Sequence, residues 1–220
     1  EHKFNMEVGD GDRKQLMSGT IDRVDICENG TDVYVRIIDY KTGKKDFNIV
    51  KTYYGIDIQL MVYMEAAMKL VAKMRPGKNV IPAGVFYYNI SDPIVSATTE
   101  SAEEIEDKIK GELRLKGMVN SDKDIAEKMD NTEGTSLNIP VSRKADGGFD
   151  SRRSKVMNTE QFNILGRFVD VRAIDTADRI VGGDIRRSPY KDGQFSSCDR
   201  CPYGAVCGFS VDLPGCNYRK

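Results

Sequence analysis

Long hydrophobic runs and a dominant charge sign are both missing from this 220-residue sequence. No apolar stretch approaches the roughly 18 residues that a membrane span needs, so we expect no membrane segment. The formal net charge is −1, so no global field attracts nucleic acid, and any DNA contact must come from local basic patches. The polar start shows no signal peptide and carries no initiator Met, which suggests a piece of a longer chain.

Cysteine is also scarce, and the five cysteines form an odd number. That count argues against a secreted disulfide framework and favours a reducing, cytoplasmic setting. Hydrophobic residues make up 40% of the chain and charged residues 30%. The chain should therefore fold around a core, as one large domain or one domain with an appendage.

The hydrophobic pattern predicts an α/β fold with a central mixed sheet flanked by helices. The apolar periodicity of the helices places Leu70, Met74 and Ile180 on core-facing sides. Residues 131–155 are polar and glycine-containing, and indicate a loop or irregular β-structure. Strands are expected over 4–8, 18–30, 31–43 and 80–90, and helices over 55–74, about 101–117, 121–130 and 159–181.

Two acids and one lysine are predicted to meet at the end of a β-hairpin. The stretch "IIDYKTG" (37–43) ends a buried-looking strand with Asp39 and Lys41 at alternate positions, so both side chains point to one face. A turn centred between residues 30 and 31 places Asp22 directly opposite Asp39, on that same face.

Such a cluster has two interpretations. Two carboxylates held close together repel unless a proton or a cation lies between them, and hard oxygen ligands suit Mg²⁺ or Mn²⁺. A metal held there could activate water for phosphodiester hydrolysis, with Lys41 offsetting the developing charge. The alternative is a cross-strand ion pair worth about 0–1 kcal/mol. Asp22 at the matching register favours the metal site.

The next helix adds a polar pair. Gln59 and Tyr63 are separated by four positions, so they share one helical face. A chance glutamine beside a core tyrosine is the plain alternative. A glutamine on an apolar face needs a polar partner, however, and a catalytic pocket or a DNA strand would supply one.

The stretches "GTIDRVD", "IIDYKTG" and "QLMVY" resemble, in order, three motifs of RecB-family nucleases in the PD-(D/E)xK superfamily. The similarity is strongest to the C-terminal nuclease domain of the B subunit of AddAB-type ATP-dependent helicase–nucleases. The resemblance implies that Asp22, Asp39 and the carbonyl of Tyr40 bind the metal and that Lys41 serves catalysis. It also implies that Gln59 and Tyr63 hold DNA and order the site.

The resemblance further implies a magnesium-dependent deoxyribonuclease, acting as an exonuclease on single-stranded DNA in double-strand-break repair and recombination. Single-stranded or duplex DNA and a helicase–nuclease A subunit, in a heterodimer, would be its partners. Residues 1–195 would form the nuclease domain, with 91–155 as a family-specific insertion. Family members carry a histidine on an upstream helix, a role that does not transfer to His2 in its extended segment.

The tail contains a second signal, Cys198-x2-Cys201-x5-Cys207. Closely spaced thiols in a reducing setting indicate metal or iron–sulfur ligation, and zinc is the main competitor. The resemblance favours a [4Fe–4S] cluster on residues 196–220, whose fourth ligand lies upstream of the nuclease core. The cluster could therefore be absent from this chain, and Cys216 could substitute as a ligand.

Contacts with nucleic acid are expected around the end of the hairpin. Lys44 and Lys45 directly follow the acidic strand and are candidate phosphate ligands, while Tyr87 and Tyr88 could stack on bases. Solvated charges and core-flanking tyrosines are the plain alternatives. A different class of function, a catalytically silent and cluster-stabilised DNA clamp or subunit-docking module, also fits the tail. The intact Asp22, Asp39 and Lys41 weigh against it.

Overall fold

The computed structural model describes residues 1–8, 14–95, 101–199 and 201–219. Its elements are, in chain order, β1 (His2–Val8), β2 (Gln15–Ile21), β3 (Arg23–Asn29), β4 (Asp32–Lys41), α1 (Ile49–Tyr53), α2 (Gln59–Met74), β5 (Asn79–Asn89), α3 (Ala102–Leu113), β6 (Lys116–Asn120), α4 (Lys123–Met129), β7 (Val156–Met157), α5 (Thr159–Val181), β8 (Lys191–Asp192), β9 (Phe195–Ser196) and α6 (Gly204–Cys207).

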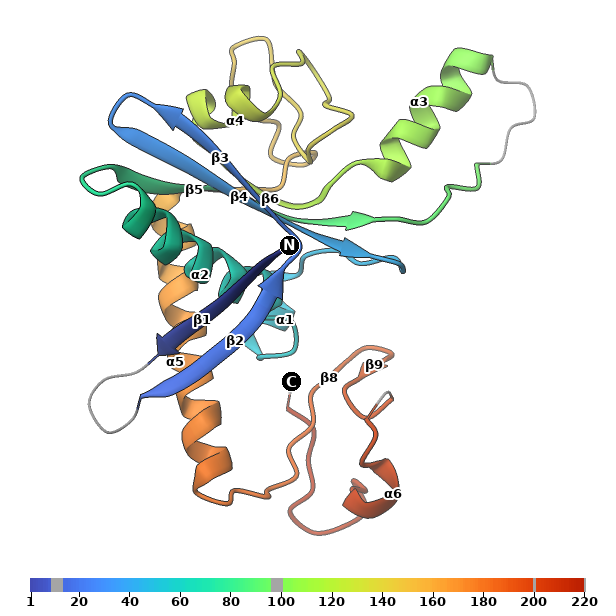
Figure 1. Cartoon of the computed structure of the whole chain (residues 1–220). Coiled ribbons are helices and arrows are strands. Elements are labelled where there is room, and N and C mark those ends of the chain that lie inside the picture. The colour runs from blue at the N-terminus through green and yellow to red at the C-terminus, as the bar shows by residue number, and fades with distance from the viewer. Residues whose placement is uncertain (9–13, 96–100, 200, 220) are drawn as a thin grey trace.

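A mixed five-stranded sheet forms the centre of the molecule, in the order β3-β4-β5-β6-β7 (Figure 1). The β3–β4 and β5–β6 pairs are antiparallel, and the β4–β5 and β6–β7 pairs are parallel. The chain reaches β5 from β4 through α1 and α2, which is the long crossover that parallel neighbours require. The predicted α/β fold with a central mixed sheet is confirmed.

The β3–β4 hairpin has the register that the sequence predicts. Asn29 pairs with Asp32, and Arg23 pairs with Ile38, so the residue numbers of each pair sum to 61. Gly30 lies in the connecting turn with a φ of 62°, a left-handed conformation that glycine adopts without steric cost. The strand β4 is rich in valine and isoleucine, which favour extended backbone.

The extended run predicted over 18–30 is interrupted at Asp22. Residues before this point form β2, which pairs only with β1 in a separate two-stranded sheet, and residues after it form β3. The Oδ2 atom of Asp22 accepts a hydrogen bond from the Tyr40 backbone N–H at 2.8 Å. The Asp22 carboxylate thus satisfies a backbone N–H of β4 just beyond the last residue pair of the hairpin.

Strand alternation divides the core between the two faces of the sheet. The face covered by α2 and α5 buries Val33, Ile37 and Val85 against both helices and the β1–β2 hairpin. The opposite face buries Ile38 and Phe86 against α4 and the irregular segment that follows it. Successive residues of β4 and β5 therefore serve different layers.

The helix α5 matches its predicted bounds and is capped as its sequence indicates. Asn158 and Gln161 form a capping box at its start, and Gly183, with a φ of 69°, follows its end. Ile180 is exposed, however, and so are Leu70 and Met74 at the end of α2. The core-facing predictions for these three residues were wrong, because the buried face of α2 runs through Ala67 and Val71 instead, and burial in α5 ends at Val169.

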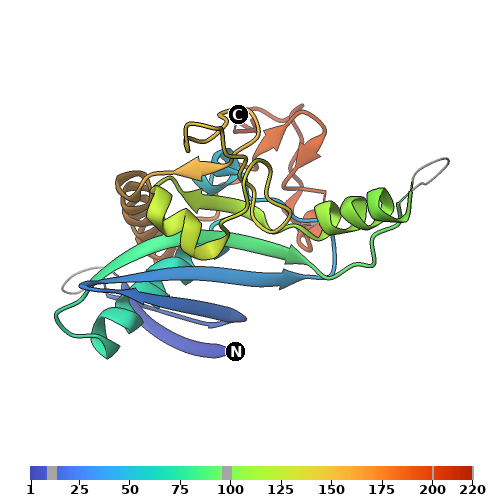
Figure 2. The ribbon, with the colours of Figure 1, turned by 90° about the horizontal axis from the view of Figure 1, so that it is seen from above.

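The segment 91–155 supplies part of the central sheet, since it contains β6 (Figure 1). Its helix α3 begins with a capping box of Ser101 and Glu104 and projects away from the rest of the molecule in both views (Figure 2). The short elements β8, β9 and α6 belong to the tail. None of the helices in the described ranges combines the length and apolar character that crossing a bilayer requires.

Candidate active site

The predicted acids come together at the carboxyl end of β4. The ladder places Arg23 opposite Ile38, so Asp22, one residue beyond the ladder, reaches the level of Asp39. Burial raises the pKa of Asp39, and the nearby Asp22 carboxylate raises it further. The hydrogen bond from the Tyr40 N–H holds Asp22 across the end of the strand.

Asp39 is a buried acid, with 2% of its surface exposed. Lys41 and Lys45 lower its pKa, but they do not outweigh the effect of burial. Lys41 Nζ lies 2.6 Å from Asp39 Oδ2, an oxygen that has no hydrogen bond of good geometry among the described residues. An acid held this way needs a proton or further positive charge.

A chain of hydrogen bonds leads from Lys41 to α2. Lys41 Nζ donates to Gln59 Oε1 at 3.0 Å, and Gln59 Nε2 donates to the Tyr63 hydroxyl at 2.9 Å. The tyrosine ring packs edge-on against Phe4 of β1, with 5.8 Å between ring centroids. Gln59 therefore orients Lys41. The polar partners that Gln59 needs on this helical face are the Lys41 ammonium and the Tyr63 hydroxyl.

A second lysine lies beside the first, and sequence reasoning missed the groups that hold it. Lys45 Nζ lies 3.2 Å from Asp57 Oδ1, and the same oxygen accepts a hydrogen bond from the Tyr87 hydroxyl at 2.7 Å. The ammonium groups of Lys41 and Lys45 lie 5.6 Å and 5.1 Å from the centroid of the Tyr87 ring. Two cations therefore share one aromatic ring next to Asp39.

The position of Tyr87 follows from the parallel pairing of β4 and β5, which aligns it with Asp39. Burial and the hydrogen bond to Asp57 raise its pKa. Tyr87 is fully buried, so the predicted stacking of Tyr87 on a DNA base was wrong. The signal that could have identified Asp57 is an acid between two isoleucines, two positions before Gln59, as in "GIDIQ".

A basic cleft adjoins this site. Lys44 and Lys45 line it at the end of β4, together with Lys116 of β6 and Lys155. Its volume is about 760 Å³. Lys155 is paired with Asp46 at 2.5 Å, and Lys44 is exposed. Three acidic residues also line the cleft, so its positive charge is partly offset, and Lys45 is the lysine that links the cleft to Asp39.

The acid pair suits a hard divalent cation. Within the described ranges, no three His, Cys, Asp or Glu side chains lie close enough together to hold a metal ion. Two carboxylates do meet, one of them carries a buried oxygen without a good hydrogen bond, and their mutual repulsion favours a shared cation. Mg²⁺ commonly binds through one or two carboxylates and keeps several waters, so this donor set fits it.

The described tail cysteines, Cys198, Cys201, Cys207 and the buried Cys216, do not lie close enough together to hold a metal ion. The Cys201 N–H donates to the Cys198 carbonyl in a turn, and Cys207 ends α6. As placed, these thiols do not form a ready cluster site, and iron–sulfur ligation stays a prediction. Cys27 is half-buried in β3 among apolar side chains.

Acids at a strand end, a lysine two residues on and a helical Gln–Tyr pair carry the resemblance to RecB-family nucleases, and comparison with known families agrees with that resemblance. The sequence profile of the PD-(D/E)XK nuclease superfamily matches residues 1–208. That range contains both acids, Lys41, the Gln59–Tyr63 pair and all five strands of the central sheet. The chain belongs to the PD-(D/E)XK nuclease superfamily.

Several relatives share one name, which describes the B subunit of an ATP-dependent helicase/deoxyribonuclease. The protein of Thermoanaerobacter sp. (strain X514) is 38% identical over 202 residues, which are 91% of this chain and 17% of the relative. Those of Caldanaerobacter subterraneus subsp. tengcongensis and Clostridium botulinum (strain Hall) are 39% and 38% identical over 215 residues, which are 97% of this chain and 18% of each relative. The chain thus spans less than a fifth of the length of these relatives.

Proposed function

We propose that the chain is a divalent-metal-dependent deoxyribonuclease domain that hydrolyses phosphodiester bonds of single-stranded DNA. The observation that carries this proposal is the meeting of Asp22, buried Asp39 and Lys41 at one strand end. Asp22, Asp39 and the Tyr40 carbonyl would hold Mg²⁺ or Mn²⁺. Such a metal, when bound, polarises the scissile phosphate and lowers the pKa of an attacking water.

The side chains supply orientation and charge. Lys41, held between Asp39 and Gln59, is placed to orient the nucleophile and to stabilise negative charge that develops on the phosphate. Tyr63 fixes Gln59, so the lysine keeps one position before substrate arrives. Lys44 and Lys45 would bind neighbouring phosphates along the basic cleft.

The names of the relatives extend the proposal to the whole protein. In the whole protein, this domain would be part of the B subunit of an ATP-dependent helicase/deoxyribonuclease. That subunit would pair with an A subunit in the cytoplasm. The helicase would deliver single strands to this site, and exonucleolytic cleavage would serve DNA repair and recombination.

Cleavage of a labelled single-stranded oligonucleotide by the chain in Mg²⁺ tests the activity. Lys41→Ala should lower kcat by about 100-fold or more, because an oriented donor to the developing charge is lost. Lys41→Gln keeps a donor toward Asp39 and controls for folding. Lys73→Ala, an exposed lysine in the last turn of α2, should cleave like the unsubstituted chain.

Cleavage that is indifferent to Lys41, or that persists in EDTA, would contradict the assignment. A catalytically silent DNA clamp or docking module predicts DNA binding without any metal-dependent cleavage, so the same assay separates the two functions.

We also propose that the tail carries a [4Fe–4S] cluster on Cys198, Cys201 and Cys207 in the whole protein, a role that rests on their spacing and on the family resemblance. No catalytic step depends on it. A visible absorption spectrum of anaerobically purified protein should show the broad charge-transfer bands of iron–sulfur. A colourless, zinc-containing protein would contradict the proposal.

A further inference from the structure

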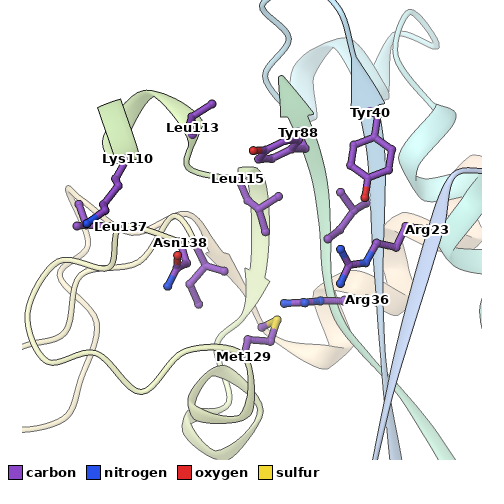
Figure 3. A pocket seen from close by; sticks show the side chains of 12 residues that line it. Arg23, Arg36, Tyr40, Tyr88, Lys110, Leu113, Leu115, Met129, Leu137 and Asn138 are labelled. Carbon is purple, nitrogen blue, oxygen red and sulfur yellow. The ribbon is translucent and has the colours of Figure 1, made fainter. Parts of the chain in front are cut away.

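A cavity of about 570 Å³ lies on the face of the sheet opposite Asp39 (Figure 3). Arg23, Arg36 and Tyr40 line one side of it, from β3 and β4. The facing side comes from the end of α3, from the residue before β6 and from the segment after α4, with Leu113 and Leu115 among its residues. The candidate active site makes no use of this cavity.

The cavity begins one residue away from each metal-binding candidate. Arg23 follows Asp22, and Tyr40 follows Asp39. Because successive residues of an extended chain point to opposite faces, each acid has a neighbour whose side chain faces the cavity. The Tyr40 N–H that holds Asp22 belongs to the same residue whose ring lines the cavity. A ligand in the cavity therefore lies against the residue that positions Asp22.

The lining is cationic. Arg23, Arg36 and Lys110 contribute to it, and no acidic residue is among the described lining residues, although Lys110 is paired with Glu106 at 2.7 Å. Asp25 holds both guanidinium groups from the side, through Nε of Arg23 at 2.8 Å and Nε of Arg36 at 2.7 Å. A guanidinium carries five N–H donors in a planar fork, so these bonds orient the two groups and still allow a phosphate to bind.

The rest of the lining suits a flat, apolar group. Tyr40 and Tyr88 meet edge-on, with ring centroids 5.9 Å apart. Ile38, Leu115 and Met129 provide apolar surface below them. Tyrosine rings beside guanidinium groups bind single-stranded nucleic acid through base stacking and phosphate contacts.

We propose that this cavity binds a nucleotide next to the scissile phosphate, with its base against the Tyr88 ring and its phosphate at Arg23 and Arg36. The inference rests on the proposed nuclease function and deepens it. A base can enter the cavity only when it is unpaired. In a duplex its Watson–Crick edge is bonded to the opposite strand and its two faces are stacked on neighbouring bases. The cavity would thus make the nuclease select single strands over duplex DNA.

The test uses single-stranded oligonucleotides with 2-aminopurine at one position at a time, bound to the chain in EDTA so that no bond is cleaved. Fluorescence at one position should change strongly, and the matching duplex should show no such change. Tyr88→Leu should remove the change and weaken single-strand binding by about 5- to 100-fold, the range expected from losing one stacked base. Tyr88→Phe keeps the ring and should restore both.

A second variant protects the test against misfolding. Leu115→Trp fills the cavity and should also block the base, whereas Leu70→Trp, on an exposed position of α2, is its control and should bind normally. In cleavage assays with Mg²⁺, the filled variant should raise KM for single strands and leave kcat within about threefold.

The outcomes separate the two proposals. Normal cleavage with binding unaffected by Tyr88→Leu and Leu115→Trp overturns the cavity inference alone, and points to a protein side chain as its occupant. Position-specific fluorescence that depends on Tyr88, in a chain that never cleaves, supports the cavity and overturns the nuclease function. A chain that binds single strands and duplex equally, with no position-specific signal, also overturns the cavity inference.

Discussion

Removing the hydroxyl group of Tyr87 should separate the stability of this site from its chemistry. The Tyr87→Phe change deletes one buried oxygen and leaves the ring between the ammonium groups of Lys41 and Lys45. The lost hydrogen bond, 2.7 Å long, ends on the Asp57 carboxylate. Both partners are buried, Tyr87 completely and Asp57 with 7% exposed.

The magnitude follows from the charge on the acceptor. A hydrogen bond to a charged group contributes about 1.5–3 kcal/mol, compared with about 0.5–1.5 kcal/mol for a neutral pair. Asp57 keeps its ion pair with Lys45 at 3.2 Å, so no isolated charge is left behind. The free energy of unfolding should therefore fall by about 1.5–3 kcal/mol, which lowers Tm by roughly 3–12 °C for a chain of this size.

Urea unfolding followed by circular dichroism measures this loss. Tyr34→Phe is the matched control, because the hydroxyl of the also buried Tyr34 accepts a 3.1 Å bond from the neutral amide of the exposed Asn29, and it should cost less than Tyr87→Phe. DNA cleavage by Tyr87→Phe should fall less than tenfold, since Lys45 stays paired. A smaller loss of stability than in Tyr34→Phe, or an abolished activity in a folded protein, would refute the reasoning.

Three further changes probe the site and the fold. Mg²⁺ at about 100 times its Kd should stabilise the chain by about 2.7 kcal/mol, a thermal shift that Asp22→Asn should remove; a shift that survives Asp22→Asn counts against the metal site. Tyr63→Phe releases Gln59 and should lower kcat by about 3- to 30-fold with KM nearly unchanged, and an unchanged kcat would show that Gln59 needs no anchor. Burial acts to raise the pKa of Asp130, but bonds from Ser136, Thr132 and Asn138 outweigh it and lower that pKa to about 2. The lowered pKa stabilises the fold above the ordinary value of 3.8, and this contribution, about 2 kcal/mol, should disappear as the pH falls through 2. Asp130→Asn should thus cost stability at pH 7 and little at pH 2, and an equal loss at both would contradict this.

Local patterns in the chain were enough to predict the candidate acids and lysine. A tight turn with glycine at its centre determines the register of a two-stranded hairpin, so Asp22 could be aligned with Asp39 by counting. Strand alternation then placed Lys41 beside Asp39, and the helical repeat placed Gln59 beside Tyr63. Each of these relations acts over a few residues and depends on backbone geometry alone.

Relations between segments that are distant in the chain could not be predicted from the sequence. The strand β6 lies in a segment that reads as loop and helix, because five residues with a glycine in the middle carry little strand signal. Its place in the sheet depends on pairing with β5, which precedes it by almost thirty residues. The exposure of Ile180 likewise depends on where the neighbouring elements end, which periodicity does not contain.

The order of residues alone was sufficient for the hairpin register, the two acids with their lysine, and the helix that presents Gln59, because these follow from local chain geometry. The folded arrangement was needed to find that Asp57 and Tyr87 hold Lys45 beside Asp39, and that Arg23, Tyr40 and Tyr88 surround a cavity behind the acids. Those groups come from separate strands and loops. They meet only when the sheet forms, and its formation joins distant segments of the chain at a cost in conformational entropy.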